Sequence, residues 1–128
     1  MAYFAYESVT LAGGTAGATT NYTTSVWNGY VHAFSVKLGT IATSETLTIT
    51  GAETGNPIAL IPASTATANV WSLPRTAIET VAGAAIAYTT GGANYAYDRV
   101  PIVNERMKIV VSQCTATAAG TILVYVGG

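Results

Sequence analysis

The stretch from Glu105 to Val126 limits the fold more than any other part of the chain, because apolar residues recur there at every second position. The positions concerned are Met107, Ile109 and Val111, and then Ile122, Val124 and Val126. A period of two is typical of a β-strand with one buried face. Small residues between the two runs, from Cys114 to Gly120, indicate a loop. The stretch therefore predicts two strands joined as an antiparallel hairpin.

Shorter alternating segments fill much of the remaining chain, and Gly, Pro and Asn residues separate them. The expected strands cover residues 3–11, 22–26, 30–38, 45–50, 58–61, 69–73, 84–89 and 95–103. Asn28-Gly29 is a turn signal, and prolines at both ends of residues 58–61 suit the edge of a sheet. About eight short strands at regular spacing predict an all-β fold: a two-sheet antiparallel β-sandwich, jelly-roll-like, or a barrel.

Three local features refine this expectation. The sequence Thr76-Ala77-Ile78-Glu79 matches a capping box, so at most one short helix is expected near residues 76–83. Residues 30–38 are expected to place Tyr30, His32, Phe34, Val36 and Leu38 on the core face. Residues 1–12 carry aromatic side chains on both faces, which predicts an edge strand or an arm that contacts a neighbouring subunit.

A length of 128 residues predicts one domain, residues 1–128, large enough to bury a core without metals or disulfides. Charged residues make up only 9% of the chain, which suggests a largely neutral surface that other subunits cover. With a formal net charge of −1, no nucleic-acid partner is expected. No apolar run approaches the length of a membrane span, and no signal peptide is evident, so no membrane partner is expected.

The residue types that carry catalysis are few. His32, Cys114 and Asp98 are each the single residue of their kind, so neither a usual zinc site nor a Ser-His-Asp triad with a nucleophile elbow is expected. His32 is interpreted as a core or interface residue with its hydrogen bonds made. The glutamates and Asp98 belong to no motif, and most are expected at solvated turns or strand ends. We expect no enzyme, no catalytic residue, no cofactor and no metal.

The aromatic residues allow two interpretations. Trp27, Trp71 and several tyrosines could form a platform on which sugar rings stack, or they could be core and subunit-contact residues. The low charge around these residues favours the interpretation that they are core and subunit-contact residues. The candidate residues for contact with other subunits or a capsid are Tyr3, Phe4, Tyr6, Trp27 and Trp71.

The closing segment also resembles the end of small virion proteins of tailed bacteriophages. It reads Asp98-Arg99-Val100-Pro101-Ile102-Val103, then Glu105-Arg106-Met107-Lys108-Ile109-Val110-Val111, and finally Gly120-Thr121-Ile122-Leu123-Val124-Tyr125-Val126. It is most similar to capsid decoration, or cement, proteins. Hairpins of the same kind recur in phage tail and minor head proteins. The resemblance covers about a quarter of the chain. It implies a β-sandwich or β-tulip on the outer head lattice, often trimeric, and brings no catalytic residues.

Two functions from different classes follow as expectations. The first is a structural virion protein, made in the host cytoplasm, that binds the major capsid protein at the capsid surface and stabilises the head as a homo-oligomer, most simply a trimer. The second is a carbohydrate-binding or host-attachment module that uses Trp27, Trp71 and tyrosines. An exposed aromatic cluster would favour the second function, and a flat neutral face or a threefold assembly would favour the first.

Overall fold

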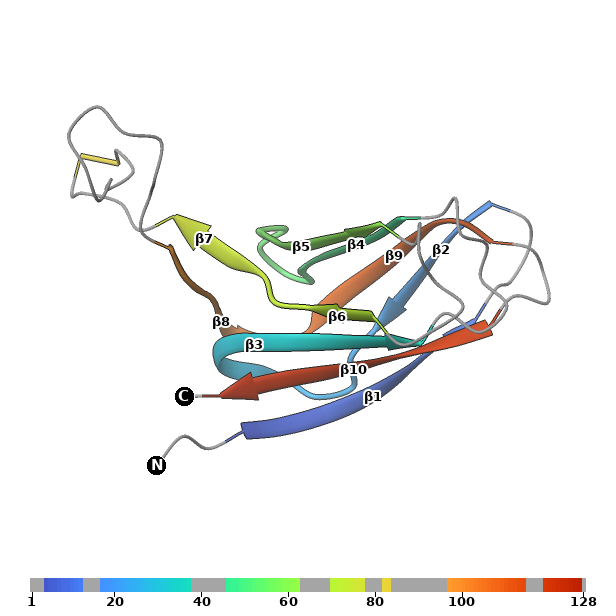
Figure 1. Ribbon diagram of the computed structural model, residues 1–128, viewed down its shortest axis with the longest axis horizontal. Coiled ribbons are helices and arrows are strands. Elements are labelled where there is room, and N and C mark those ends of the chain that lie inside the picture. Colours follow the sequence, from blue (N-terminus) through green and yellow to red (C-terminus); the bar gives the residue numbers. More distant parts are fainter. Residues whose placement is uncertain are drawn as a thin grey trace.

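The computed structural model describes residues 4–12, 17–37, 46–62, 70–77, 82–83, 97–114 and 119–127. These residues form ten β-strands in two antiparallel sheets, which confirms the predicted all-β sandwich (Figure 1). The described residues include no helix, and therefore none that is long and apolar enough to cross a membrane.

The larger sheet has six strands. Its order is β1-β10-β3-β8-β7, and the short strand β6 pairs separately with β3. The bounds are β1 Phe4–Ala12, β3 Trp27–Lys37, β6 Val70–Ser72, β7 Arg75–Ala77, β8 Tyr97–Glu105 and β10 Ala119–Gly127. Strand β1 lies at one edge and pairs with β10 along its whole length. Whether residues 1–12 also reach another subunit stays a prediction.

The smaller sheet has four strands in the order β2-β9-β4-β5. Their bounds are β2 Gly17–Tyr22, β4 Thr46–Gly51, β5 Pro57–Pro62 and β9 Met107–Cys114. Strand β5 is an edge strand with a proline at each end, as the sequence predicts. Proline suits this position because an edge strand needs hydrogen bonds on one side only.

The core lies between the two sheets and is almost entirely aliphatic. Alternate residues of β9, β4 and β10 point into it, and the side chains of Leu47, Ile49, Met107, Ile109, Val111, Ile122 and Val124 are completely buried. Phe34 is the one large aromatic residue among the fully buried side chains of the described chain. The inward faces predicted for residues 45–50 and for the closing stretch are confirmed.

The predicted hairpin between the last two strands is wrong. Strand β9 pairs with β2 and β4 in the smaller sheet, and β10 pairs with β1 and β3 in the larger sheet. The two strands therefore lie in opposite layers and face each other across the core (Figure 1). Alternation could not distinguish these arrangements, because either one buries every second residue of each strand. Strand β9 also extends to Cys114, which was predicted to lie in the loop.

The face predicted for residues 30–38 is only half right. Phe34 and Val36 are buried in the core, but further towards the start of the strand the core residue is Val31, and Tyr30 is exposed. Leu38 lies outside the described residues. The reason is a β-bulge: Tyr125 pairs with Ala33 and the next residue of β10 pairs with Val31, so His32 has no partner in the register. An extra residue in one strand reverses the inside–outside alternation beyond it. His32 is half-buried instead of lying in the core.

Three further local predictions differ from the structure. Residues 22–26 were expected to form a strand, but the strand in this region is β2, which ends at Tyr22. Asn28-Gly29 is no turn and lies inside β3. Thr76 of the expected helix lies in β7, opposite Asp98, where sheet pairing overrides the local helix signal. Residues 78–81 and the strand expected at 84–89 lie outside the described residues.

Candidate functional site

Three aromatic side chains form a row on the outer face of the larger sheet. Tyr6 of β1 lies directly opposite Tyr125 of β10 in the register, and Tyr125 points outward because Val124 and Val126 on either side are buried. The ring centroids of Tyr6 and Tyr125 are 5.9 Å apart, and those of Trp71 and Tyr125 are 5.7 Å apart. Tyr6 is 67% exposed and Trp71 is 60% exposed. These residues, called the aromatic row below, present three tilted rings to solvent.

Two arginines lie on the same outer face. Arg75 of β7 is directly opposite Arg99 of β8, so both side chains leave the same side of the sheet. The Arg99 guanidinium lies 5.0 Å from the ring centroid of Tyr30, and its Nε is 4.0 Å from Oδ1 of Asp98. The Arg75 Nη1 donates hydrogen bonds to the backbone oxygens of His32 and Pro74, at 3.2 and 2.7 Å. We call Arg75 and Arg99 the arginine pair.

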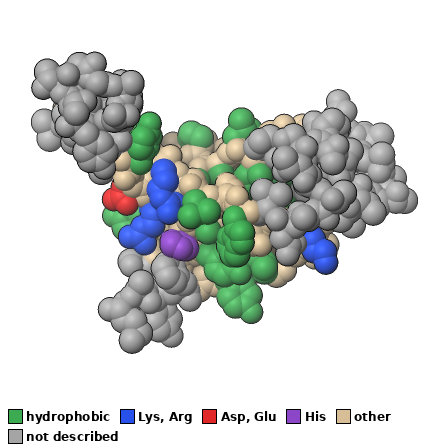
Figure 2. All heavy atoms as spheres, in the orientation of Figure 1, with side chains coloured by type: hydrophobic (Ala, Val, Ile, Leu, Met, Phe, Trp, Pro, Cys, Tyr) green, Lys and Arg blue, Asp and Glu red, His purple; other side chains and the backbone are tan. Residues whose placement is uncertain are grey.

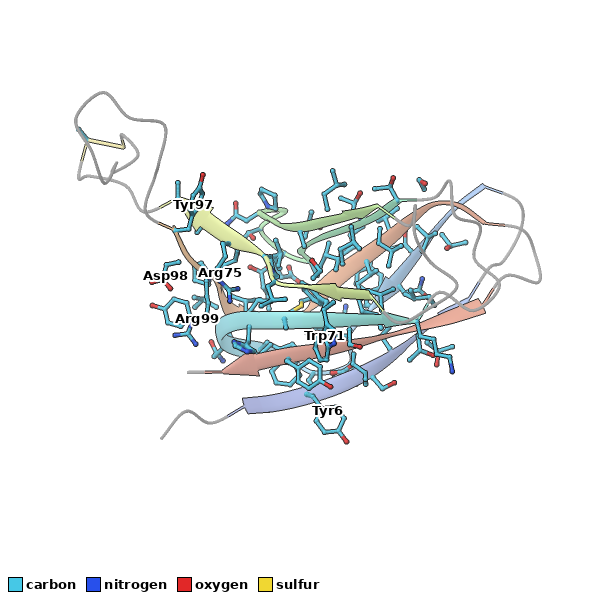
Figure 3. All side chains as sticks on the ribbon, in the orientation of Figure 1. Tyr6, Trp71, Arg75, Tyr97, Asp98 and Arg99 are labelled. Atoms are coloured by element: carbon cyan, nitrogen blue, oxygen red, sulfur yellow. The ribbon has the colours of Figure 1, made fainter. Side chains whose placement is uncertain are left out.

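The arginine pair and the aromatic row occupy neighbouring parts of one face. In Figure 3, Tyr6 and Trp71 lie over β1, β10 and β3, and both arginines lie towards the β7–β8 side. Figure 2 shows hydrophobic side chains gathered in the middle of this face, with basic side chains next to them. Leu73, between β6 and β7, is also 55% exposed. The face thus combines aromatic and cationic groups, and both are accessible.

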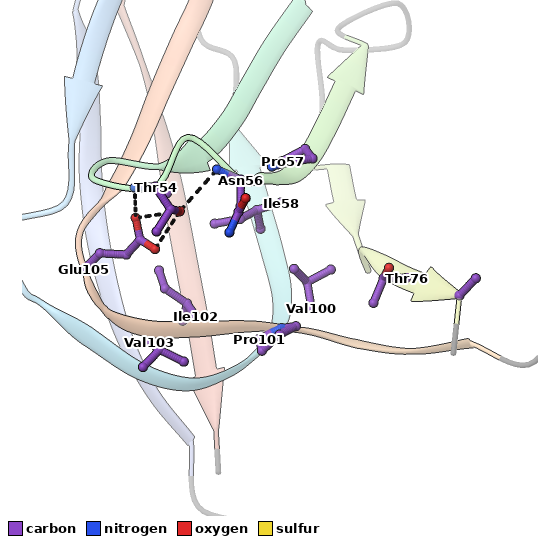
Figure 4. Close-up of a pocket in the computed structure, with 12 residues that line it drawn as sticks. Thr54, Asn56, Pro57, Ile58, Thr76, Val100, Pro101, Ile102, Val103 and Glu105 are labelled. Atoms are coloured by element: carbon purple, nitrogen blue, oxygen red, sulfur yellow. Dashed lines mark hydrogen bonds between the residues drawn. The ribbon is translucent and has the colours of Figure 1, made fainter. Parts of the chain in front are cut away.

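A pocket opens where the edges of the two sheets diverge. It has a volume of about 550 Å³. Its walls come from the 51–58 segment, β7 and β8 (Figure 4). A second hollow of about 430 Å³ shares Pro57, Ile58, Thr76 and Val100 with it, so the two form one groove beside β5. Apolar side chains and threonines line most of the groove, with Asn56 and Glu105 at one end and Arg75 beside the second hollow.

Glu105 is a buried carboxylate at this end of the groove. Its Oε1 accepts hydrogen bonds from the backbone N–H groups of Glu53 and Thr54, at 3.0 and 3.1 Å, and its Oε2 accepts one from the Thr54 hydroxyl at 2.9 Å. The bond from the Thr54 backbone is the main reason that the pKa of Glu105 lies below its usual value, since these bonds favour the charged form. Glu105 therefore anchors the turn after β4 to the end of β8.

Glu7 has the same kind of role at the other edge of the molecule. Its carboxylate accepts hydrogen bonds from the backbone N–H groups of Thr24 and Ser25, at 2.6 and 3.0 Å, and so joins β1 to the segment between β2 and β3. Partial burial acts to raise the pKa of Glu7, but the hydrogen bonds from Thr24 and Ser25 outweigh it, so the pKa is lowered. Most of the acids were expected to be solvated, but Glu7 and Glu105 are structural anchors.

The structure brings together only two of the residues predicted for contacts. Tyr6 and Trp71 meet through Tyr125, whereas Trp27 is half-buried and packs against the core. Phe4 begins β1, but its side chain, like all of Tyr3, lies outside the described residues. Tyr125 and the arginine pair were not among the residues predicted from the sequence. Tyr125 could have been found, because it alternates with two buried valines.

No group of three or more His, Cys, Asp or Glu side chains that could hold a metal ion occurs in the part of the chain that the structure describes. Comparisons of the chain with models of known protein families, with curated proteins and with solved structures gave no match.

Proposed function

We propose that this chain is a structural protein of a bacteriophage particle that binds the assembled head and stabilises it. The observation that carries the proposal is the strand order. Apart from β6 and β7, the eight strands lie as β1-β10-β3-β8 and β2-β9-β4-β5. We infer that this is a jelly roll, in which two Greek keys wrap into two four-stranded sheets. Domains of viral capsids are among the proteins built in this way.

The surface suits contacts with other proteins. Large apolar side chains are exposed on both sheets, among them Leu60 on β5, Trp71 on β6 and Val103 on β8, which are 68%, 60% and 71% exposed. Exposed apolar groups with few charges between them favour binding by shape and apolar area. In the proposal the partner is the major capsid protein, and the chain acts at the capsid surface as a homo-oligomer, most simply a trimer. Several copies that bind adjacent lattice points gain avidity.

Strand β1 offers a specific route for such a contact. It lies at the edge of the larger sheet, so one side of its backbone is available to pair with a strand of a neighbouring subunit. Deletion of residues 1–7 would be a poor test, because Glu7 holds the 24–25 segment. Replacement of the exposed Tyr6 leaves that anchor intact.

The test is to strip the protein from phage particles, add it back, and measure the temperature at which the genome is released. We expect added protein to raise this temperature at both low and high salt, because contacts with few charges are little screened. Tyr6→Ser should weaken the effect, and Tyr22→Ser, a matched change on the other sheet, should not. No rise with the unaltered protein would refute the proposal.

A second function is favoured by the aromatic row. Exposed rings in a line are suited to stack against the apolar faces of sugars, and lectin domains also use jelly rolls. In this alternative the chain is a carbohydrate-binding or host-attachment module. Binding to a glycan array that is lost in Trp71→Ala, without any effect of the protein on head stability, would select it over the capsid role.

A further inference from the structure

The arginine pair is unusual because the two residues lie directly opposite each other. Like charges at opposed positions of an antiparallel pair destabilise it. The chain has only five basic residues in total, yet two of them occupy these positions. Within the described residues, the one ion pair is between Arg99 and its neighbour Asp98, at the 4.0 Å limit of such a contact. This arrangement suits an anionic group that binds between the two guanidinium groups.

Contacts within the protein fix both guanidinium groups, and this favours the binding of an anion over solvation by water. Arg75 is fixed by two hydrogen bonds from Nη1 to backbone oxygens, and Arg99 stacks on Tyr30. The side chain of Arg99 remains 31% exposed. A planar guanidinium in a fixed position can bind a carboxylate with two parallel hydrogen bonds, and it loses less side-chain entropy when it does so.

The aromatic row supplies the second half of the site. From β1 to β8 the face spans three strand spacings, about 14 Å at ~4.8 Å each. A chain of several sugar rings can therefore reach from the aromatic row to the arginine pair. We propose that the row and the pair together form a binding site for an acidic carbohydrate, a saccharide whose rings carry carboxylate groups. Its rings would stack on Trp71 and Tyr125, and a carboxylate would bind Arg75 and Arg99.

This inference rests on the second of the proposed functions, carbohydrate binding, and adds the charge of the ligand. We commit to a carbohydrate because the row offers three tilted rings beside two fixed cations, and a saccharide whose rings carry carboxylate groups matches both features. Single-stranded nucleic acid also combines rings with anions. Nucleic acid is therefore an outcome that the test must distinguish.

The experiment is calorimetric titration of the whole protein at low salt with trigalacturonate, with its methyl ester, and with oligothymidylate. The ester has the same rings without the charges. We expect binding of the acid to be at least about tenfold tighter than binding of the ester. Arg75→Gln and Arg99→Gln should each reduce affinity for the acid towards that of the ester. Trp71→Ala should weaken both, and Arg106→Gln, the same charge change near Tyr22 on the other sheet, should change neither.

Each alternative outcome is decisive. Equal affinity for acid and ester would overturn the acidic ligand and leave carbohydrate binding standing. If neither saccharide binds, both the inference and the second proposed function fail. Tighter binding of oligothymidylate than of trigalacturonate would replace the carbohydrate with nucleic acid. Circular dichroism shows whether each variant is folded. If Trp71→Ala is unfolded, Tyr6→Ser on the exposed edge strand provides a second test of the aromatic row.

Discussion

Gly51 lies directly against the carboxylate of Glu105, so that a methyl group added at Gly51 would overlap the carboxylate oxygens. The close approach explains why the residue after Thr50 has no side chain. Strand β4 ends at Gly51, and the turn that follows donates its hydrogen bonds to Glu105. The glycine and the glutamate thus form one unit that closes this end of the groove.

We predict that Gly51→Ala destabilises the protein by about 1–3 kcal/mol, because the turn or the carboxylate has to move. The free energy of unfolding in urea is the measurement. Glu105→Ala removes the obstacle, so Gly51→Ala should have a much smaller effect in that background. An equal loss in both backgrounds would mean that the carboxylate is not what restricts residue 51.

The stability of the protein should fall in acid through Glu105. Because hydrogen bonds lower the pKa of Glu105 in the folded state, its stabilising effect is complete above the pKa of an unfolded glutamate, ~4.3. The effect is lost as the pH falls from there through the lower folded-state pKa. Glu7, whose pKa is also lowered, contributes with the same sign.

Urea unfolding between pH 7 and pH 3 tests this prediction. Glu105→Gln should be less stable than the unaltered protein at pH 7, and the difference should shrink as the pH approaches 3. Glu53→Gln is the control, because Glu53 contacts Glu105 through its backbone and its side chain is exposed. A difference between Glu105→Gln and the unaltered protein that is the same at every pH would contradict the proposed role.

The sequence predicted which residues face the core more reliably than which strands are neighbours. Ile109 and Val124 were assigned correctly, because alternation depends only on burial of one face. Their strands were wrongly paired, since contact across the core and contact within a sheet produce the same pattern. His32 was misplaced for a related reason: a bulge changes the alternation without changing the residue types that surround it.

The candidate site was harder to predict because its parts come from distant segments. Tyr6, Trp71 and Tyr125 belong to three strands that only the sheet order brings together. Glu105 binds backbone groups about fifty residues earlier in the chain, and no side-chain motif signals such a partner. Arg75 lay next to an expected helix, so its position opposite Arg99 could not be inferred.

Gly29 should tolerate a side chain less well than Gly55. Both have positive φ angles, of 134° and 71°, so alanine is strained at either position. At Gly29 the added carbon would also lie 2.6 Å from the backbone oxygen of Gly127, whereas at Gly55 nothing lies within 4 Å. We expect Gly29→Ala to lower the melting temperature clearly more than Gly55→Ala. Equal shifts would show that β10 moves away from β3 without difficulty.

The final prediction concerns buried positions of the core on β9 and β10, which lie in opposite sheets. Ile109 of β9 and Val124 of β10 are both completely buried, so an aspartate at either position would place a carboxylate among aliphatic side chains. Burial of an unpaired charge has a free-energy cost of several kcal/mol, comparable to the ~5–15 kcal/mol stability of a typical domain. We expect Ile109→Asp and Val124→Asp to yield no soluble folded protein. Lys108→Asp and Thr121→Asp, which change outward-facing neighbours on the same two strands, should remain folded with a normal β circular dichroism spectrum. Equal loss of soluble protein in both sets would mean that the inward and outward faces of β9 and β10 are assigned incorrectly.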